Sequence, residues 1–463
     1  MPETLSYDIA ADLDTPVSAY LKLRPLRPRF LLESVERGFR VARYSFIGLD
    51  ACQEIRVDER GLTVDGRVHG HLNGKASLLT ALRDALTRSP MLAPGNGQLP
   101  LSGGLVGFTS YEFARHFEPA ALPQGADPTT PEAWFVAPRS LLVFDHLTRG
   151  VTLLHAGNEA ERQSLRREVA RLLAGPVPRA QRRNRHGAVT ASLKREEFAD
   201  GVERVSAHIR AGDVYQLVLS VRFDGDCEGE PFAVYRALRL LNPSPYMYFC
   251  EGDGITVVGS SPEALVRLSG SRAELRPIAG THPRGTNSAE DETLAQRLLA
   301  DPKENAEHIM LVDLARSDLG RVARAGSIRV NPDREIERYS HVMHLVSGVT
   351  GELAPGRDAF DLFAAAFPAG TLVGAPKVRA MQIIDEIEPV GRGLYGGAVG
   401  YFGSNGGMDQ AITIRTIVFS NGSYRYQAGA GIVADSHADK EYEEVAAKSA
   451  ALRRALELAE EMP

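Results

Sequence analysis

The sequence has few cysteines, no surplus of positive charge and no long apolar run, and each feature argues against a class of protein. The three cysteines, Cys52, Cys227 and Cys250, lie far apart and form no CxxC pair, so neither a zinc site nor a disulfide framework is expected. The formal net charge of −6 gives no support to nucleic-acid binding. No run of about 18 apolar residues occurs, so no membrane span is expected.

The remaining bulk properties are those of an ordinary globular protein. Hydrophobic residues make up 43% of the chain and charged residues 24%. The N-terminal residues are acidic and polar, unlike a signal peptide, and we expect a cytoplasmic protein. A chain of 463 residues is too long for one simple core, so two domains or one large elaborated domain are expected.

The order of apolar runs predicts two regions joined by a linker. Residues 1–175 hold short apolar runs broken by Gly and Pro, which are typical of strands, together with two helical patterns. Residues 176–192 are basic and contain prolines, and we interpret them as a surface linker, with an anion-binding patch as the alternative. Residues 193–463 mix helices with further strand runs. This pattern predicts an α+β fold of large, mostly antiparallel sheets packed with helices.

Two segments with helical patterns each carry glutamates three residues apart. Glu304 and Glu307 lie in the first segment, and Glu441 and Glu444 lie in the second. Residues three apart share one face of a helix. Two such faces brought together would form an oxygen-rich site suited to Mg²⁺, with an anionic substrate among the remaining ligands. Two solvated helix faces are the alternative.

Several other residues have both a chemical and a structural interpretation. Glu263, in GSSPEALVRL, is either a buried acid with a raised pKa or a glutamate in a surface turn. Arg415 lies in an apolar strand pattern, where a buried arginine needs either a structural ion pair or a substrate carboxylate. His344 is either an acid or base facing a cleft or a satisfied core histidine. Gly280 and Thr281 stand in a segment that is either an anion site or an ordinary turn.

Taken together, ten motifs in order resemble the chorismate-utilising enzymes, and most closely the anthranilate synthase component I family. They include LLESVERGFRVARYSFIG, GSSPEALVRL, RPIAGTHPRG, DPKENAEHIMLVDLARSDLGRV, QAITIRTI, AGAGIVADS and EYEE, and they cover roughly residues 30 to 460. The resemblance implies the chorismate-binding fold and a reaction in which chorismate loses its C4 hydroxyl, gains ammonia at C2 and releases pyruvate. The product would be anthranilate, at the first step of tryptophan biosynthesis.

The resemblance also implies roles for individual residues. Glu307 and Glu444 match Mg²⁺ ligands, with Glu304 and Glu441 acting through water or in support. Glu263 resembles the general acid for the leaving hydroxyl, and His344 matches a histidine linked to pyruvate elimination. The positions that match chorismate contacts are Gly280, Thr281, Thr371, Tyr395, Arg415, Gly429, Ala430, Gly431 and Lys448.

Two positions separate members of this family. Gln216 stands where isochorismate-forming relatives carry a lysine that activates water, and glutamine is no base for that step. Ala279 stands where many aminodeoxychorismate synthases carry a nucleophilic lysine. Both residues favour anthranilate synthase. Aminodeoxychorismate synthase component I is the alternative enzyme. A catalytically silent amino-acid sensor on the same fold is the non-enzymatic alternative.

The resemblance further implies feedback inhibition and a protein partner. LLES and NPSPYMYF resemble a pocket for inhibitory tryptophan, with a plain packing seam as the alternative. Its candidate residues are Glu33, Ser34, Asn242, Pro245, Tyr246, Met247 and Tyr248. None of the cysteines stands in a Gly-x-Cys-x-Gly setting, so a separate glutamine amidotransferase subunit, anthranilate synthase component II, is expected in a hetero-oligomer. Departures from the family pattern occur at Val221, His282, Ser317 and Val373.

Overall fold

The structure is a computed structural model. It describes residues 8–35, 43–70, 72, 74–94, 99–119, 121, 130–178, 183–252, 254–338 and 342–462, apart from the side chain of Thr281. The helices, in chain order, are α1 Pro16–Lys22, α2 Lys75–Arg88, α3 Glu159–Leu173, α4 Arg195–Ala211, α5 Pro231–Leu241, α6 Ser288–Ala300, α7 Pro302–Gly320, α8 Ala359–Ala366, α9 Lys377–Ile387 and α10 Ala438–Glu461. Short 3₁₀ helices are η1 Arg24–Leu26, η2 Tyr111–His116 and η3 Gly370–Leu372.

The strands fall into an N-terminal and a C-terminal set. The N-terminal set is β1 Pro28–Glu33, β2 Tyr44–Asp58, β3 Gly61–Val64, β4 Arg67–Val68, β5 Gly104–Thr109, β6 Ala133–Asp145 and β7 Gly150–His155. The next strands are β8 Arg185–His186, β9 Thr190–Ala191, β10 Gln216–Glu228, β11 Tyr246–Gly252, β12 Ile255–Ser261, β13 Ala264–Ser269, β14 Arg272–Leu275, β15 Ile278–Pro283 and β16 Arg329–Val330. The last are β17 Glu335–Arg338, β18 Val342–Val346, β19 Val349–Glu352, β20 Gly374–Ala375, β21 Ala398–Gly403, β22 Met408–Ile412, β23 Thr416–Ser420 and β24 Ser423–Ile432.

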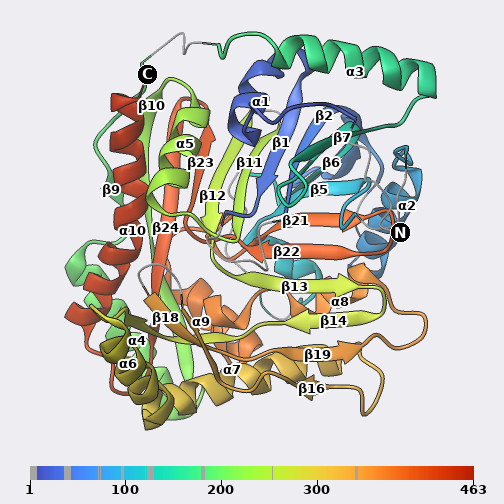
Figure 1. Ribbon diagram of the computed structural model, residues 1–463. Helices are drawn as coiled ribbons and strands as arrows, with labels where there is room; N and C mark the ends of the chain where they lie inside the picture. Colours follow the sequence, from blue (N-terminus) through green and yellow to red (C-terminus); the bar gives the residue numbers. More distant parts are fainter. Residues whose placement is uncertain are drawn as a thin grey trace.

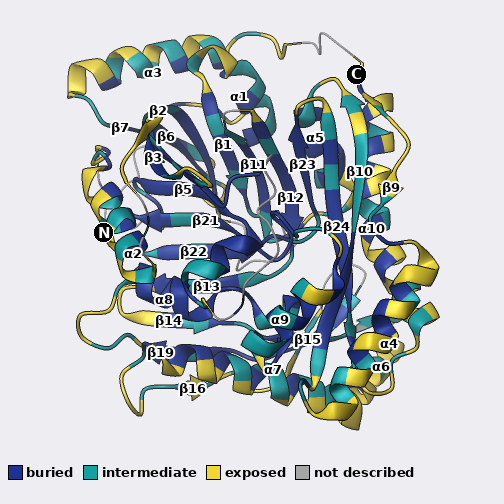
Figure 2. Cartoon of the chain, turned by 180° about the vertical axis from the view of Figure 1, so that it is seen from behind, coloured by how far each residue is buried: buried dark blue, intermediate teal, exposed yellow. Residues whose placement is uncertain are grey.

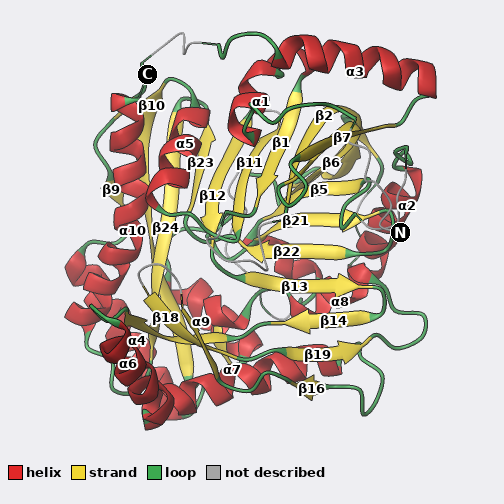
Figure 3. Cartoon of the chain, viewed as in Figure 1, coloured by secondary structure: helices red, strands yellow, loops and turns green. Residues whose placement is uncertain are grey.

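The strands link into one large hydrogen-bonded network and one small sheet. Within the described residues the large network holds 21 strands, and β15, β18 and β17 form the small sheet. The long strands β2 and β6 pair antiparallel, as do β10 and β24. Helices lie along the sides of this network, with α10 and α5 on one side and α7 beneath it (Figures 1 and 3). The predicted α+β fold of mostly antiparallel sheets packed with helices is confirmed.

The alternation of side chains along the strands places the core in layers. In β1, Phe30 joins a buried cluster built mainly from strands, whereas Leu31 joins a second cluster that contains α1, α3, α5 and α10. The same alternation occurs in β11, where Tyr248 faces the first cluster and Phe249 the second. Successive residues of a strand point to opposite faces, so these strands have apolar groups on both faces. The strands are accordingly dark and the outer helix faces light in Figure 2.

Strands of the predicted N-terminal and C-terminal regions pair with one another. β1 pairs with β11, and β5 pairs with β21. The two regions therefore share one hydrogen-bonded network. The expected division into residues 1–175 and 193–463 stays a prediction. No helix in the described parts of the chain is long and apolar enough to cross a membrane.

Candidate active site

Glu263 lies in the turn between β12 and β13, with its carboxyl against apolar surroundings. It lines a cavity of about 40 Å³ together with Leu265, Leu275, Leu314 and other residues. Burial raises the pKa of Glu263 from its ordinary value of 4.5 to about 7, although the Thr371 hydroxyl and the charges of Lys448 and Arg415 act in the opposite direction. A carboxyl with this pKa is partly protonated near neutral pH, so it can donate a proton.

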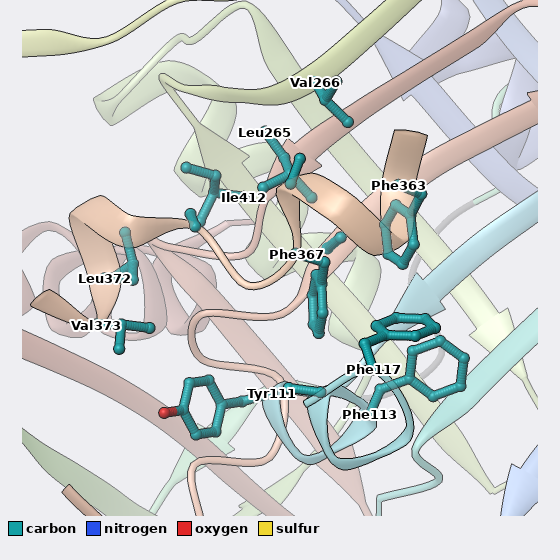
Figure 4. Close-up of a cluster of buried hydrophobic side chains, with 14 of the residues drawn as sticks. Tyr111, Phe113, Phe117, Leu265, Val266, Phe363, Phe367, Leu372, Val373 and Ile412 are labelled. Carbon is teal, nitrogen blue, oxygen red and sulfur yellow. The ribbon is translucent and has the colours of Figure 1, made fainter. Parts of the chain in front are cut away.

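Thr371 is the hydrogen-bond partner of Glu263. Its Oγ1 donates to Glu263 Oε1 at 3.1 Å from the short helix η3. The two residues after Thr371 are fixed by packing, because Leu372 and Val373 belong to a buried cluster with Phe367 and Tyr111 (Figure 4). The same cluster contains Leu265 of β13, close to Glu263 in the chain. One apolar cluster thus positions both partners of the hydrogen bond.

Arg415 is a partly buried cation with no carboxylate within hydrogen-bond distance in the described part of the structure. It lies between β22 and β23 in the left-handed backbone region, with φ of 49°. Its Nη1 donates to Asn242 Oδ1 at 3.4 Å. Burial lowers the pKa of Arg415, and the nearby carboxyl of Glu263 raises it. Of the two interpretations of this arginine, the arrangement favours an external anion over a structural ion pair.

Two predicted glycines of β24 lie against the side chains of two other predicted residues, Tyr395 and Gln216. A Cβ atom added at Gly429 would lie 2.6 Å from Tyr395 Oη, and one added at Gly431 would lie 2.6 Å from Gln216 Nε2. Residues two apart share one face of a strand, so this face of β24 has only backbone beside the tyrosine hydroxyl and the glutamine amide. Ala430 between them is buried. The absence of side chains at the two glycines lets the Tyr395 hydroxyl and the Gln216 amide lie directly against the backbone of the strand.

Lys448 of α10 connects this strand to the acidic helices. Its Nζ donates to the backbone oxygen of Gly429 at 3.0 Å and forms an ion pair with Glu444 Oε1 at 2.6 Å. Both side chains are about half exposed. The i, i+4 spacing on α10 permits this pair. The ammonium therefore neutralises one of the predicted metal ligands.

The four glutamates of α7 and α10 lie within electrostatic range of one another. Burial raises the pKa of Glu307, and the charges of Glu304, Asp435 and Glu441 raise it further. Burial also raises the pKa of Glu441, with a further contribution from Glu444. An ion pair of 3.0 Å between Lys303 and Asp435 joins the start of α7 to the segment before α10.

The spacing of these carboxylates is wider than that of a formed metal centre. Among the described residues, no three or more His, Cys, Asp or Glu side chains are close enough to hold a metal ion. The donor chemistry nevertheless suits Mg²⁺, because mutually repelling carboxylate oxygens gain from a divalent cation. Lys303 and Asp435 were not among the residues singled out from the sequence. The signal in the sequence for Asp435 is an acidic residue three positions before the start of α10 at Ala438.

His344 and Gly280 face each other across the small sheet. His344 Nδ1 contacts the backbone oxygen of Gly280 at 3.1 Å, and a carbonyl oxygen can only accept, so Nδ1 carries the proton. Burial lowers the pKa of His344, and the charge of Arg415 lowers it further. The backbone of Thr281 lies opposite His344 in the register of β15 and β18, and its side chain lies outside the described part. Gly280 has φ of 55°, and a Cβ there would lie 2.8 Å from Glu304 Oε2.

The residues of the predicted inhibitor pocket lie along β1, β11 and the end of α5. Glu33 is opposite Met247 in the register, and Leu32 is opposite Tyr248. Glu33 is buried and accepts hydrogen bonds from Tyr235 and Arg239. Ser34 Oγ is buried and has no hydrogen-bond partner among the residues that the structure describes. An unpaired buried hydroxyl is costly, which is consistent with a ligand group at this position.

Three other residues of that prediction already have protein partners. Tyr246 Oη donates to Asp409 Oδ1 at 2.9 Å and contacts Arg267, and Tyr248 Oη lies 2.5 Å from Thr416 Oγ1. Asn242 bonds to Arg415, as described above. Pro245 directly precedes β11. The inhibitor pocket stays a prediction.

Comparisons with known proteins agree with this arrangement. Residues 27–454 match the family model of chorismate binding enzymes. Anthranilate synthase component 1 of Thermus thermophilus is 45% identical over 97% of this chain and 97% of its own length. The protein of the same name from Acinetobacter calcoaceticus is 43% identical over 97% and 94% of the two chains.

Solved structures give the same result for the fold. The crystal structure of anthranilate synthase component I from Streptococcus pneumoniae superposes with a TM-score of 0.80 at 34% identity, covering 96% of this chain and 99% of that one. The menaquinone-specific isochorismate synthase MenF from Escherichia coli, at 20% identity and a TM-score of 0.69 over 95% and 91% of the chains, shares the fold. The chain belongs to the chorismate-binding enzyme family, with relatives above 40% identity that are anthranilate synthase component 1 proteins.

Proposed function

We propose that this protein converts chorismate and ammonia to anthranilate, pyruvate and water. The observation that carries the proposal is the placement of Glu263, an acid with a pKa of about 7, within electrostatic range of the partly buried Arg415. The first supplies a proton and the second a binding site for a carboxylate, and chorismate needs both. The similarity to anthranilate synthase component 1 proteins supports this reaction over others of the family.

In the first half of the reaction, ammonia attacks C2 of the ring and the C4 hydroxyl leaves. Glu263 protonates that oxygen, so that water departs in place of hydroxide. Arg415 holds a substrate carboxylate with its guanidinium, and the glycine face of β24 admits the ring next to Tyr395. In the second half, a proton is lost from the ring as pyruvate departs, which makes the ring aromatic. His344 either takes this proton or orients the group that does.

Gln216 favours an attack by ammonia over an attack by water. Its amide lies beside Gly431 at the start of β10. An amide is no general base near neutral pH, so water in this place is not activated. Ala279 of β15 likewise has no nucleophile to form a covalent adduct with the ring.

The acidic residues of α7 and α10 would hold Mg²⁺, with Glu307 and Glu444 as direct ligands and Glu304 and Glu441 in support. When bound, the ion supplies Lewis-acid stabilisation of the negative charge that develops on the leaving oxygen. The mutual charge effects among Glu304, Glu307, Glu441 and Glu444 support a cation there. Lys448 forms an ion pair with Glu444. Its ammonium also binds the backbone oxygen of Gly429, so it would place positive charge next to a residue that we expect to contact the substrate.

Ammonia would come from glutamine through a glutamine amidotransferase partner. Burial raises the pKa of Cys227 to about 11 and that of Cys250 to about 12, and burial also raises the pKa of Cys52. Thiols with raised pKa values carry little thiolate at neutral pH, so none is suited to attack glutamine. This supports a separate subunit for glutamine hydrolysis. Tryptophan would inhibit from the Ser34 region by favouring a less active state.

The test is incubation of the purified protein with chorismate, Mg²⁺ and an ammonium salt, with and without tryptophan. We expect equal amounts of anthranilate, detected by its fluorescence, and pyruvate, detected by chromatography. Formation of aminodeoxychorismate, which retains the enolpyruvyl group, would instead identify the alternative enzyme of this family. Failure to consume chorismate would overturn the proposal.

A further inference from the structure

We propose that Asn242 is a positioning residue that holds the Arg415 guanidinium ready for the substrate carboxylate. The inference rests on the proposed function, because it concerns the anion that Arg415 binds. It assigns to Asn242 a task at the candidate active site, whereas the sequence motif places this residue in the inhibitor pocket.

The amide of Asn242 is oriented by its own hydrogen bonds. Asn242 caps the C-terminal end of α5, and its backbone N–H donates to the oxygen of Leu238 at 2.8 Å. Its Nδ2 donates to Ser260 Oγ at 3.1 Å, and Ser260 Oγ donates to the backbone oxygen of Asn242. Ser260 is fully buried. Because Nδ2 is committed to Ser260, the side-chain oxygen Oδ1 points the other way, toward Arg415 Nη1 at 3.4 Å.

Ser260 also holds the backbone of Arg415. The Ser260 N–H donates to the Arg415 oxygen at 3.1 Å, so one buried serine contacts both members of the pair. Arg415 stands in a left-handed conformation in a connection between two strands, where the ordinary strand geometry does not orient its side chain. An arginine side chain has several rotatable bonds, and fixing them on substrate binding costs entropy. A guanidinium already held by Asn242 avoids part of that cost.

A neutral amide suits this task better than a carboxylate. An aspartate at the same position would form a charge-assisted bond to the guanidinium and would compete with the substrate for it. Asparagine fixes the direction of Nη1 and leaves the guanidinium without a carboxylate within hydrogen-bond distance among the described residues. The side chain at position 242 thus determines how firmly Arg415 is held and how much of its charge is available.

The experiment compares Asn242→Ala and Asn242→Asp with the unchanged protein, using chorismate turnover with ammonium and Mg²⁺. Loss of a hydrogen bond to a charged group predicts a rise of about tenfold in KM for chorismate in Asn242→Ala. Asn242→Asp should raise KM further, while kcat falls less than KM rises in both variants. The matched control is Asn184→Ala, because Asn184 Oδ1 accepts from the N–H of Glu230 at the opposite end of α5. It should lower stability without changing KM.

A double-mutant cycle with Arg415→Lys separates positioning from a purely structural role. If Asn242 acts through the guanidinium, Asn242→Ala should have little further effect on KM in the Arg415→Lys protein. Additive effects, or an unchanged KM in Asn242→Ala, would overturn the inference. Failure of the proposed function would be distinguishable from failure of this inference, because the unchanged protein would then form no anthranilate from chorismate.

Discussion

Replacing Glu263 by glutamine tests the proposed general acid, because glutamine keeps the shape of the side chain and removes the transferable proton. Thr371 Oγ1 donates to Glu263 Oε1 in the structure, and the amide oxygen of glutamine can accept the same hydrogen bond. We therefore expect a folded variant that binds chorismate. Its turnover should be greatly reduced, because general acid catalysis typically contributes a factor of about 10² to 10⁴.

The magnitude of the pH effect follows from the pKa of the buried carboxyl. With a pKa of about 7, Glu263 is protonated in half of the molecules at pH 7. A carboxyl with its ordinary pKa would be protonated in only about 0.3% of them at the same pH, so burial increases the acidic form roughly 150-fold. Activity that depends on this proton should be highest below pH 7 and fall as the pH rises through about 7.

The assay is the pH profile of kcat/KM for chorismate at constant free ammonia, which reports the pKa of the free enzyme. Thr371→Val should move the alkaline limb of the profile to higher pH. The hydrogen bond from Thr371 favours the charged carboxylate, so its removal should raise the pKa of Glu263. In Glu263→Gln the limb near pH 7 should be absent from the residual activity. A limb that stays in place in Glu263→Gln would refute the assignment.

The same pKa shift affects stability. The folded protein holds the Glu263 proton more tightly than the unfolded chain, so unfolding free energy should fall as the pH rises from 4.5 to about 7. Urea unfolding at several pH values measures this decrease, which should be smaller in Glu263→Gln. An equal decrease in both proteins would mean that other groups cause it.

Three further changes address the metal, the inhibitor and the core. Glu444→Gln should weaken Mg²⁺ binding measured by calorimetry while the protein stays folded, and an unchanged affinity would remove Glu444 from the ligand set. Ser34→Phe should relieve tryptophan inhibition while ammonium-dependent turnover persists, because a phenyl ring replaces the buried hydroxyl that we expect to contact the inhibitor. Undiminished inhibition would place the inhibitor elsewhere. Arg392→Met leaves the buried Glu388 without its partner and should cost about 3–5 kcal/mol in urea unfolding. Arg171→Met, which breaks an exposed pair with Glu168, should cost much less stability than Arg392→Met, and equal losses would contradict the burial argument.

The sequence predicts the helices and the long strands well, because their patterns are local. The helical segment expected around Glu441 and Glu444 is found as the helix Ala438–Glu461. Helical periodicity and strand alternation can be recognised within one short segment of the chain. The segment PIAGTHPRGTN shows the opposite case. It contains Gly and Pro residues typical of a turn, yet Ile278–Pro283 forms a strand whose partner β18 lies about sixty residues later. Non-local pairing of this kind leaves little trace in one segment.

The candidate site could be predicted from the sequence only as a set of motifs, because its contacts join distant segments. Helical spacing places Glu304 beside Glu307 and Glu444 beside Lys448. No spacing rule indicates that Lys303 reaches Asp435, or that the glycine face of β24 meets Tyr395 and Gln216. The acidity of Glu263 likewise depends on apolar residues from several elements around its cavity, and not on its neighbours in the chain.

The pairing of Asn242 with Arg415 is the strongest example of this limit, since 173 residues separate the two. An arginine in an apolar strand pattern indicates only that some anion is needed. The structure adds that, in its described part, the guanidinium has an amide and no carboxylate within hydrogen-bond distance, while the carboxyl of Glu263 acts on it only through its charge. An external carboxylate could therefore bind the guanidinium directly. A partly buried cation held by a neutral group is better explained by ligand binding than by folding, and the same logic applies to the Ser34 hydroxyl, which has no partner among the described residues.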